Sequence, residues 1–276
     1  MTVRSPVLTV CALLLLPALG SRADDEAPKT PSGSNYLVGA MLLSQPEYEG
    51  SDRRVLKLRP LWAYEWGRFR ISTSRAGAVM NFASDPQGPG ASALILSSNN
   101  LRFGAALRFD SGRQSGDSPH LQGLPDIKRT LRGRLFASWK IDEHWDLGGN
   151  VSQDLMGRHG GAVGSLDLGY HHRLSERSEW SAGLGVTAAS GQNLRTYYGV
   201  TPEQAAVSGL PAFSPGAGPR DVYAGMGFTT ALTRRWILFG NIGGSHLVGD
   251  AGASPITLQR TSYSAGLGLG YRCCRW

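Results

Sequence analysis

The chain is poor in cysteine, in charge and in long apolar runs. Its 276 residues contain three cysteines, and Cys273 and Cys274 stand next to each other near the C-terminal end. No disulfide framework is therefore expected to hold the fold together. Beyond the N-terminal region, no apolar run approaches the ~20 residues that a transmembrane helix needs. If the chain crosses a membrane, it does so with strands.

The N-terminal region has the three parts of a secretory signal. Arg4 is followed by an apolar run over residues 7–19 and then by small residues that end at Ala23. A basic start, an apolar core too short to span a bilayer and a small-residue site predict cleavage after Ala23. The alternative is a single membrane anchor. We expect residues 1–23 to be a signal peptide that is removed on export.

Charge is sparse and mildly positive. The chain has 28 Lys and Arg against 21 Asp and Glu, and removal of residues 1–23 takes away Arg4 and Arg22, which leaves a net charge of +5. The sequence has neither a basic helix nor a basic patch interleaved with aromatic residues. We therefore expect no nucleic-acid partner.

Glycine and aromatic residues are abundant, with 37 Gly, 7 Trp and 9 Tyr. This composition favours an all-β chain with many turns, and the mature length suits one domain. Residues 24–35 are polar and rich in Pro, Gly and Ser, which predicts a flexible periplasmic leader. Residues 36–276 are expected to form the β domain.

The last stretch shows most clearly which kind of sheet this is. In residues 262–272, aromatic and aliphatic residues at odd positions alternate with glycine, serine and arginine at even positions. A period of two places an apolar face on one side of a strand. In a membrane barrel such a face meets lipid, and the opposite face can be small or charged. The residues predicted to face lipid in this closing strand are Tyr263, Leu267, Leu269 and Tyr271.

Similar alternation recurs along the chain and predicts a transmembrane antiparallel β-barrel of twelve strands, with ten as the alternative. The connections between these strands alternate between long and short, as in bacterial barrels with an even strand number. Both termini then lie on the periplasmic side. The predicted strands are 36–44, 54–65, 68–82, 91–98, 101–110, 128–141, 145–155, 162–173, 179–190, 221–233, 235–247 and 260–272.

Three local features carry further expectations. Pro60 interrupts the second predicted strand and argues for a bulge there. The connection over residues 191–220 is long enough to be functional or disordered, and an ordered lid or plug is the favoured interpretation. At the C-terminus, Trp276 stands at an even position, whereas the residues predicted to face lipid stand at odd positions. Residues 273–276 are therefore expected to form a frayed tail, and the alternative is a bulge or bend at Arg272–Cys274 that makes Trp276 the closing aromatic residue.

A set of short motifs appears in fixed order along the mature chain. They are PEYEGSD at 46–52, RPL at 59–61, YEWGRF at 64–69, DSGR at 110–113, LQGLPDI at 121–127, YYGV at 197–200, SGLPAF at 208–213, RD at 220–221, LVGDA at 247–251 and SPI at 254–256. With these motifs the chain resembles the MltA-interacting protein (MipA/OmpV) family. Two departures are the CCRW ending, where the family has Tyr-Arg-Phe, and a reworked segment over residues 87–98.

The resemblance implies a β-barrel in the outer membrane of a Gram-negative cell, in contact with outer-membrane lipid. One member of that family is taken to scaffold peptidoglycan-processing enzymes, and others are linked to osmotic or antibiotic responses. A complex of cell-wall hydrolases and synthases is therefore the implied protein partner. The resemblance implies no cofactor.

One cluster could suggest catalysis or metal binding. Asp167, His171 and His172 lie close together in the sequence, with serines nearby. Asp167 and His171 share one face of a strand, whereas His172 points the other way, and no nucleophile motif accompanies them. Two adjacent histidines that face opposite sides also make a poor metal site. We expect structural lumen residues, no catalytic residues and no metal.

Charged side chains are predicted on the lumen face of several strands. Basic residues gather on the second, fifth and sixth strands and acidic residues on the seventh and eighth. This arrangement is either an ion-paired network that fills a narrow barrel or a transverse field that selects small solutes. The predicted lumen charge cluster is Lys57, Arg59, Arg102, Arg108, Arg132, Arg134, Lys140, Asp146, Asp154 and Asp167, and Glu65 is expected to face the same way.

Three functions follow from the sequence. A non-enzymatic scaffold or adaptor for peptidoglycan-processing enzymes rests on the family resemblance. A narrow, mildly anion-preferring channel for small solutes rests on the charged lumen. A barrel hydrolase rests on the histidine cluster and is the weakest of the three.

Overall fold

The computed structural model describes residues 34–73 and 89–273. The predicted signal peptide, and nearly all of the predicted leader, lie outside the described residues. The first strand begins at Ser34, two residues before the predicted start of the β domain at residue 36.

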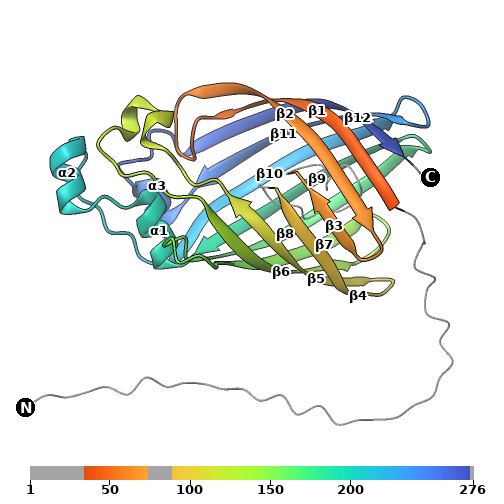
Figure 1. Ribbon diagram of the computed structural model, residues 1–276, viewed down its shortest axis with the longest axis horizontal. Coiled ribbons are helices and arrows are strands. Elements are labelled where there is room, and N and C mark those ends of the chain that lie inside the picture. The colour runs from red at the N-terminus through yellow and green to blue at the C-terminus, as the bar shows by residue number, and fades with distance from the viewer. Residues whose placement is uncertain (1–33, 74–88, 274–276) are drawn as a thin grey trace, which may run out of the picture. The chain divides into compact units, whose positions relative to one another are not determined.

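Over the described residues, twelve antiparallel strands close into one barrel in which each strand pairs with its sequence neighbours and β1 pairs with β12 (Figure 1). The predicted fold class and strand number are confirmed. The strands are β1 (Ser34–Pro46), β2 (Arg54–Trp66), β3 (Phe69–Ser72), β4 (Gly90–Ser97), β5 (Leu101–Asp110), β6 (Thr130–Lys140), β7 (Trp145–Asp154), β8 (Ala162–Ser175), β9 (Ser178–Ala189), β10 (Gly218–Ala231), β11 (Trp236–Leu247) and β12 (Thr261–Cys273).

The two ends of the barrel differ in their connections. The end that holds the start of β1 and the finish of β12, here called the termini end, has short turns of two to four residues. The opposite end, here called the loop end, carries the long connections and the three helices α1 (Gly191–Tyr198), α2 (Pro202–Ser208) and α3 (Gly249–Ala253) (Figure 1). Two short 3₁₀ helices, η2 (Ser115–Asp117) and η3 (Pro119–Leu121), lie in the β5–β6 connection. Of the helices that the structure describes, none is long and apolar enough to cross a membrane.

The glycines of β12 leave space in the lumen for side chains from the neighbouring strands. Gly266 and Gly268 face inward, and a Cβ added there would lie 2.1 Å from Met41 Cε and 2.4 Å from Phe239 Cζ. These side chains belong to a buried apolar cluster inside the barrel wall, formed by Leu37, Met41, Leu61, Ala63, Ile237 and Phe239. The small face of the closing strand thus makes room for an apolar filling along the seam.

Several local predictions differ from the structure. β3 ends at Ser72, and the rest of the strand predicted over 68–82 lies outside the described residues except Thr73. The prediction of a bulge at Pro60 is wrong for the pairing of β2 with β1. Ala40 pairs with Pro60 there without a shift of register. Alternate residues of a strand direct their N–H groups to opposite neighbours, so a proline fits where its nitrogen faces away from the partner.

The C-terminal tail does not begin where it was predicted. Cys273 belongs to β12 and pairs with Tyr36, and the pairing is regular through Arg272. The prediction of a frayed tail from Cys273 is therefore wrong at this residue, because β1 extends far enough to pair with it. Residues 274–276, including Trp276, lie outside the described residues.

Candidate functional site: the loop cap and the charged lumen

Four long connections pack together at the loop end and form what we call the cap. It consists of residues 47–53, 111–129, 190–217 and 248–260. Side chains from all four meet in one buried apolar cluster of Tyr48, Leu121, Leu124, Val200 and Ile256. The connection predicted as a lid or plug over 191–220 is thus ordered, holds α1 and α2, and gives its last residues to β10.

A second apolar cluster fastens the cap to the barrel wall. Leu194 and Tyr198 on α1 pack against Ala251 of α3 and against Ala189 and Leu247, which end β9 and β11. Leu194 and Ala251 are fully buried. The helix α1 begins after Ser190, whose side chain accepts a hydrogen bond from the backbone N–H of Asn193 and so caps the helix.

Polar contacts link segments of the cap that are far apart in the sequence. Tyr48 Oη donates a hydrogen bond to the carbonyl oxygen of Ile256 at 3.1 Å, across 208 residues. Ser254 Oγ donates to the carbonyl oxygen of Tyr198 at 2.6 Å. Burial raises the pKa of Tyr48 to about 12, so its hydroxyl stays protonated and remains a donor.

A charged group lies where the cap meets the first residues of β10. Tyr198 Oη donates to Glu49 Oε2 at 2.8 Å, and Arg220 lies 3.8 Å from Glu49 Oε1. Arg220 Nε also donates to Asp221 Oδ2 at 2.6 Å. Burial, reinforced by the nearby Glu49 carboxylate, raises the pKa of Tyr198. We call Glu49, Tyr198, Arg220 and Asp221 the latch, because they join two cap loops to the wall.

A second polar group joins the cap to β5 and β6. Tyr197 Oη donates to Asp110 Oδ2 at 3.1 Å, and Arg113 Nη1 donates to the carbonyl oxygen of Tyr197 at 2.7 Å. Arg132 lies 3.9 Å from Asp110 and donates to the carbonyl oxygens of Gly160 and Gly161 at 3.1 and 2.9 Å. Arg132 therefore braces the β7–β8 connection.

Beneath the cap, the barrel lumen holds a cavity of about 1770 Å³. Its described lining includes twelve Lys and Arg and twelve Asp and Glu residues, so the lining is balanced in charge and polarised in position. Of the predicted lumen charge cluster, nine residues line the cavity: Lys57, Arg59, Arg102, Arg108, Arg132, Arg134, Lys140, Asp146 and Asp167. Asp154 instead accepts hydrogen bonds from Thr130 and from the backbone N–H groups of Met156 and Gly160.

The charges of the lumen form separate groups along the barrel axis. Near the loop end, Arg108 and Arg132 are direct partners across β5 and β6. At the termini end, Lys140 and Asp146 are direct partners across β6 and β7. The loop end of these strands therefore holds a basic pair, whereas the termini end holds a basic residue beside an acidic one.

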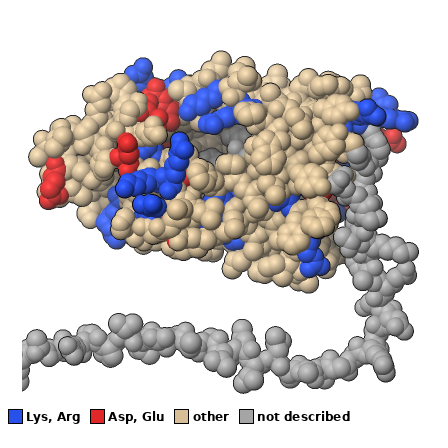
Figure 2. Space-filling view, viewed as in Figure 1, with Lys and Arg blue, Asp and Glu red and all other residues tan. Residues whose placement is uncertain are grey.

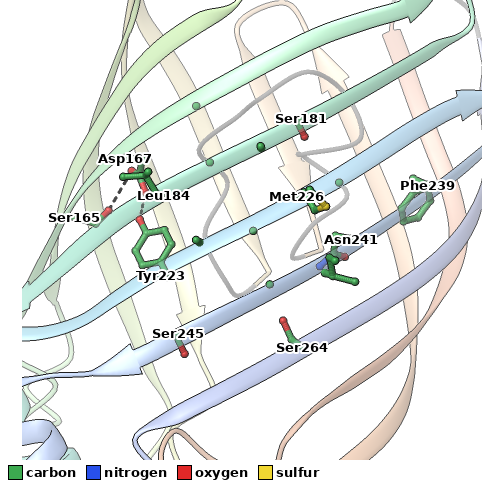
Figure 3. Close-up of a pocket in the computed structure, with 18 of the residues that line it drawn as sticks. Ser165, Asp167, Ser181, Leu184, Tyr223, Met226, Phe239, Asn241, Ser245 and Ser264 are labelled. Atoms are coloured by element: carbon green, nitrogen blue, oxygen red, sulfur yellow. Dashed lines mark hydrogen bonds between the residues drawn. The ribbon is translucent and has the colours of Figure 1, made fainter.

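The far wall of the lumen, over β9 to β12, is lined mainly by small and hydroxyl side chains (Figure 3). Tyr223 on β10 reaches across Gly185 and donates a hydrogen bond to Asp167 on β8. Ser165 donates to the same carboxylate at 3.4 Å. This bridge spans three strands and holds Asp167 against the wall.

The histidine cluster has no catalytic arrangement in the described residues. His171 Nε2 lies 2.8 Å from Asp146 and its Nδ1 lies 3.3 Å from Glu179, so carboxylates face both ring nitrogens. His172 points to the other face and stacks near Tyr170 and His144. Asp167 pairs with Tyr223 rather than with a histidine. Within the described residues, no group of His, Cys, Asp and Glu is placed to hold a metal ion.

The predicted lipid-facing residues of the closing strand lie on the outer surface of the barrel. Tyr263, Leu267 and Leu269 are exposed, and Tyr271 is half-buried. Tyr271 packs edge to face against Trp236, with ring centroids 5.4 Å apart. Its hydroxyl accepts a hydrogen bond from Arg235 at 3.1 Å.

The sequence of this barrel matches one protein family over most of its length. The family is described as MltA-interacting protein MipA, and it matches residues 38–273. The chain belongs to the MipA family. The predicted recognition is confirmed, and the protein is an outer-membrane β-barrel. For this MipA-family protein, we predict that the termini end is the periplasmic end and the loop end is the outer end, because bacterial barrels place short turns and both termini inside.

Solved structures of porins resemble the MipA-family barrel at low sequence identity. OmpT of Vibrio cholerae is 6% identical, with a TM-score of 0.40, over 87% of this chain and 97% of that one. An anion-selective porin from Comamonas acidovorans is 10% identical, with a TM-score of 0.40, over 87% and 99%. Such distant likenesses carry no argument about function. A comparison with curated proteins finds no match.

The latch was missed by sequence reasoning. Glu49, Tyr198, Arg220 and Asp221 each stand in a motif that carries the family resemblance. Glu49 and Arg220, for example, are 171 positions apart in the sequence. No local sequence pattern reveals a contact between residues that far apart. The available signal was that nearly all of these motifs fall in long connections at one end.

Proposed function

We propose that this MipA-family barrel is a non-enzymatic outer-membrane docking protein for peptidoglycan-processing enzymes. The observation that carries the proposal is the family match, since the family is described by its interaction with MltA, a lytic transglycosylase. A cell-wall enzyme works on the periplasmic side of the outer membrane. The partner therefore meets the short turns at the periplasmic end and not the cap.

Two features of the periplasmic end support this role. The turns are short and continue directly from paired strands, so they present a rigid surface that needs little ordering on binding. The β4–β5 turn exposes Asn99 and Asn100, and the β6–β7 turn exposes Asp142 and Glu143. Asp142 Oδ1 accepts hydrogen bonds from the backbone N–H groups of His144 and Trp145 at 2.7 and 2.8 Å, which fixes that turn.

Site-specific photocrosslinking in living cells tests the proposal. A crosslinking amino acid is placed at Asn99 or Glu143 on the periplasmic end, and at Val207 on the cap as the matched control. Val207 is 75% exposed, so it is equally available to a partner. We expect a cell-wall lytic enzyme, identified by mass spectrometry, from the periplasmic positions alone. Crosslinks to such an enzyme from Val207 only, or from no position, would contradict the proposal.

A second candidate function is a narrow channel for small solutes. The cavity beneath the cap and the basic residues on β2, β5 and β6 favour it. Because the described lining is balanced in charge, anion preference would have to come from the position of the basic wall and not from an excess of charge. The cap and its latch would also have to allow passage.

Planar bilayer recordings separate the channel from the docking protein. Arg102→Gln and Arg134→Gln remove charge from the lining, and we expect either change to lower anion preference measured by reversal potential. Arg132 is unsuitable for this test because it braces Gly160 and Gly161. Folded protein that inserts but does not conduct would leave these charges with a structural role.

A further inference from the structure

Two neighbouring turns at the periplasmic end concentrate positive charge. β9 pairs with β10, so the β8–β9 and β10–β11 turns lie side by side, and the backbone N–H of Ala231 donates to the carbonyl oxygen of Arg177 at 2.8 Å. These turns expose three arginines, here called the basic arc: Arg177, Arg234 and Arg235. Arg173, the cross-strand partner of Glu179, lies on the lumen face and lines the cavity instead, and Arg177 stands where this turn meets the cavity. Figure 2 shows basic side chains gathered at this end of the barrel.

Exposed acidic residues lie mainly on the β6–β7 side of the basic arc. Glu176 is exposed in the same turn as Arg177. Asp142 and Glu143 are exposed in the β6–β7 turn, which adjoins the β8–β9 turn because β7 pairs with β8. Within the two turns of the arc, three arginines stand against the one acidic residue Glu176, which leaves a net positive charge there.

Aromatic side chains place the arc at the level of lipid headgroups. Trp180 packs near Tyr170 on the outer face of the barrel, at 5.4 Å between centroids, and Trp236 packs near Tyr271 at the same distance. Such residues mark the membrane–water interface of a barrel. Arg235 donates a hydrogen bond to the Tyr271 hydroxyl, which joins the arc to this aromatic belt.

Apolar side chains flank the arginines within the same two segments. Leu174 is 65% exposed and Leu232 is 50% exposed, and both are within three residues of arginines of the arc. A soluble partner bound to the arginines would leave these leucines facing water or the membrane edge. A phospholipid can contact both kinds of side chain, because its phosphate binds the guanidinium groups and its acyl chains pack against the leucines.

We propose that the basic arc binds the phosphate groups of anionic phospholipids in the periplasmic leaflet of the outer membrane. Arginine recognises phosphate with paired N–H donors, and basic residues close to an anionic leaflet add attraction that salt screens. The binding is independent of the proposed docking role, which uses the β4–β5 and β6–β7 turns. Bound lipid would fix the depth and tilt of this side of the barrel.

Native mass spectrometry of the purified protein tests the proposal. The protein is mixed with phosphatidylglycerol or with phosphatidylcholine of matched acyl chains, and lipid-bound fractions give apparent affinities. The arc variant is Arg177→Gln with Arg234→Gln. The control variant is Arg129→Gln with Arg158→Gln, which removes the same charge from exposed sites at the outer end. Heat-modifiable gel migration verifies that each protein is folded, and single variants replace a double variant that fails to fold.

We expect the arc variant to bind phosphatidylglycerol about tenfold more weakly, and the control variant to bind as the parent does. Arg177→Lys with Arg234→Lys should fall between them, because charge remains but paired donation is lost. Equal losses in both glutamine variants, or no preference of the parent for the anionic lipid, would overturn the proposal. The proposal would also be overturned if the arc variant bound lipid as the parent does but lost a crosslink to a periplasmic protein. The arc would then be a protein-binding site.

Discussion

At the scale of single residues, glycine decides how closely the seam of the barrel closes. Gly39 on β1 faces the lumen, and a Cβ added there would lie 2.2 Å from the carbonyl oxygen of Leu269 and 2.7 Å from Gly270 Cα. Both are backbone atoms of β12, the strand that closes the barrel against β1. They cannot rotate away as a side chain can, so the absence of a side chain at this position is a condition of closure.

We predict that Gly39→Ala destabilises the barrel by about 1–3 kcal/mol, because the added methyl must push two paired strands apart. The urea midpoint of unfolding, followed by heat-modifiable gel migration, measures this. Gly164→Ala in β8 is the matched control, because its added Cβ would lie 3.5 Å from the nearest atom, an ordinary contact. Equal midpoints for Gly39→Ala and the parent would show that the seam adjusts freely.

Tyr271 is the residue at which the closing strand reaches the periplasmic interface. Its ring packs against Trp236 and its hydroxyl accepts a hydrogen bond from Arg235. We predict that Tyr271→Asp blocks assembly, because a carboxylate replaces an aromatic ring on a surface that meets lipid. Tyr271→Phe keeps the ring contact and should assemble. The folded band of outer-membrane fractions on unheated gels reports both outcomes, and a full folded band for Tyr271→Asp would contradict the prediction.

At the scale of elements, the strands were predictable and the cap was not. Alternation in residues such as Leu267 and Leu269 identifies a strand without any knowledge of its partners. The ends of strands were less certain, since Cys273 is held in β12 by the length of β1. The cap depends on pairs such as Tyr48 with Ile256, whose meeting requires the whole barrel to bring four connections to one end.

The cap should open when its packing is weakened. Leu194 on α1 is fully buried against α3 and the barrel wall. Leu194→Ala should lower the local stability of the cap by about 2–5 kcal/mol. Tyr198→Phe removes the hydrogen bond to Glu49 and should cost about 1 kcal/mol. We predict faster cleavage of the cap by proteinase K for both variants, with the larger effect for Leu194→Ala.

Fragment analysis after limited proteolysis locates the cuts in the cap. Val207→Ala is the control, because Val207 is exposed on α2 and its truncation removes no buried contact. Its cleavage rate should equal that of the parent. If Leu194→Ala is cleaved no faster than the parent, the buried contacts of α1 do not hold the cap in place.

At the scale of the whole molecule, the candidate site divides between two ends with different chemistry. The loop end carries the cap, and the termini end has short turns with the basic arc on one side. Sequence reasoning assigned most charged residues to the lumen. It could not show that Arg132, which lines the cavity as Arg134 does, also braces Gly160, because that contact depends on where the β7–β8 connection lies.

The orientation of the barrel is the prediction on which both proposals rest. Short turns and both termini at one end place that end in the periplasm. Gly209 has a positive φ of 74° and open space around it, so an epitope inserted after it should leave the cap folded. We predict that antibody labels this epitope on intact cells, whereas an epitope inserted at Asn99 is labelled only after the outer membrane is permeabilised. The reverse pattern would place the cap in the periplasm. It would make the cap, and not the β4–β5 and β6–β7 turns, the surface available to a cell-wall enzyme, and would move the basic arc to the outer leaflet.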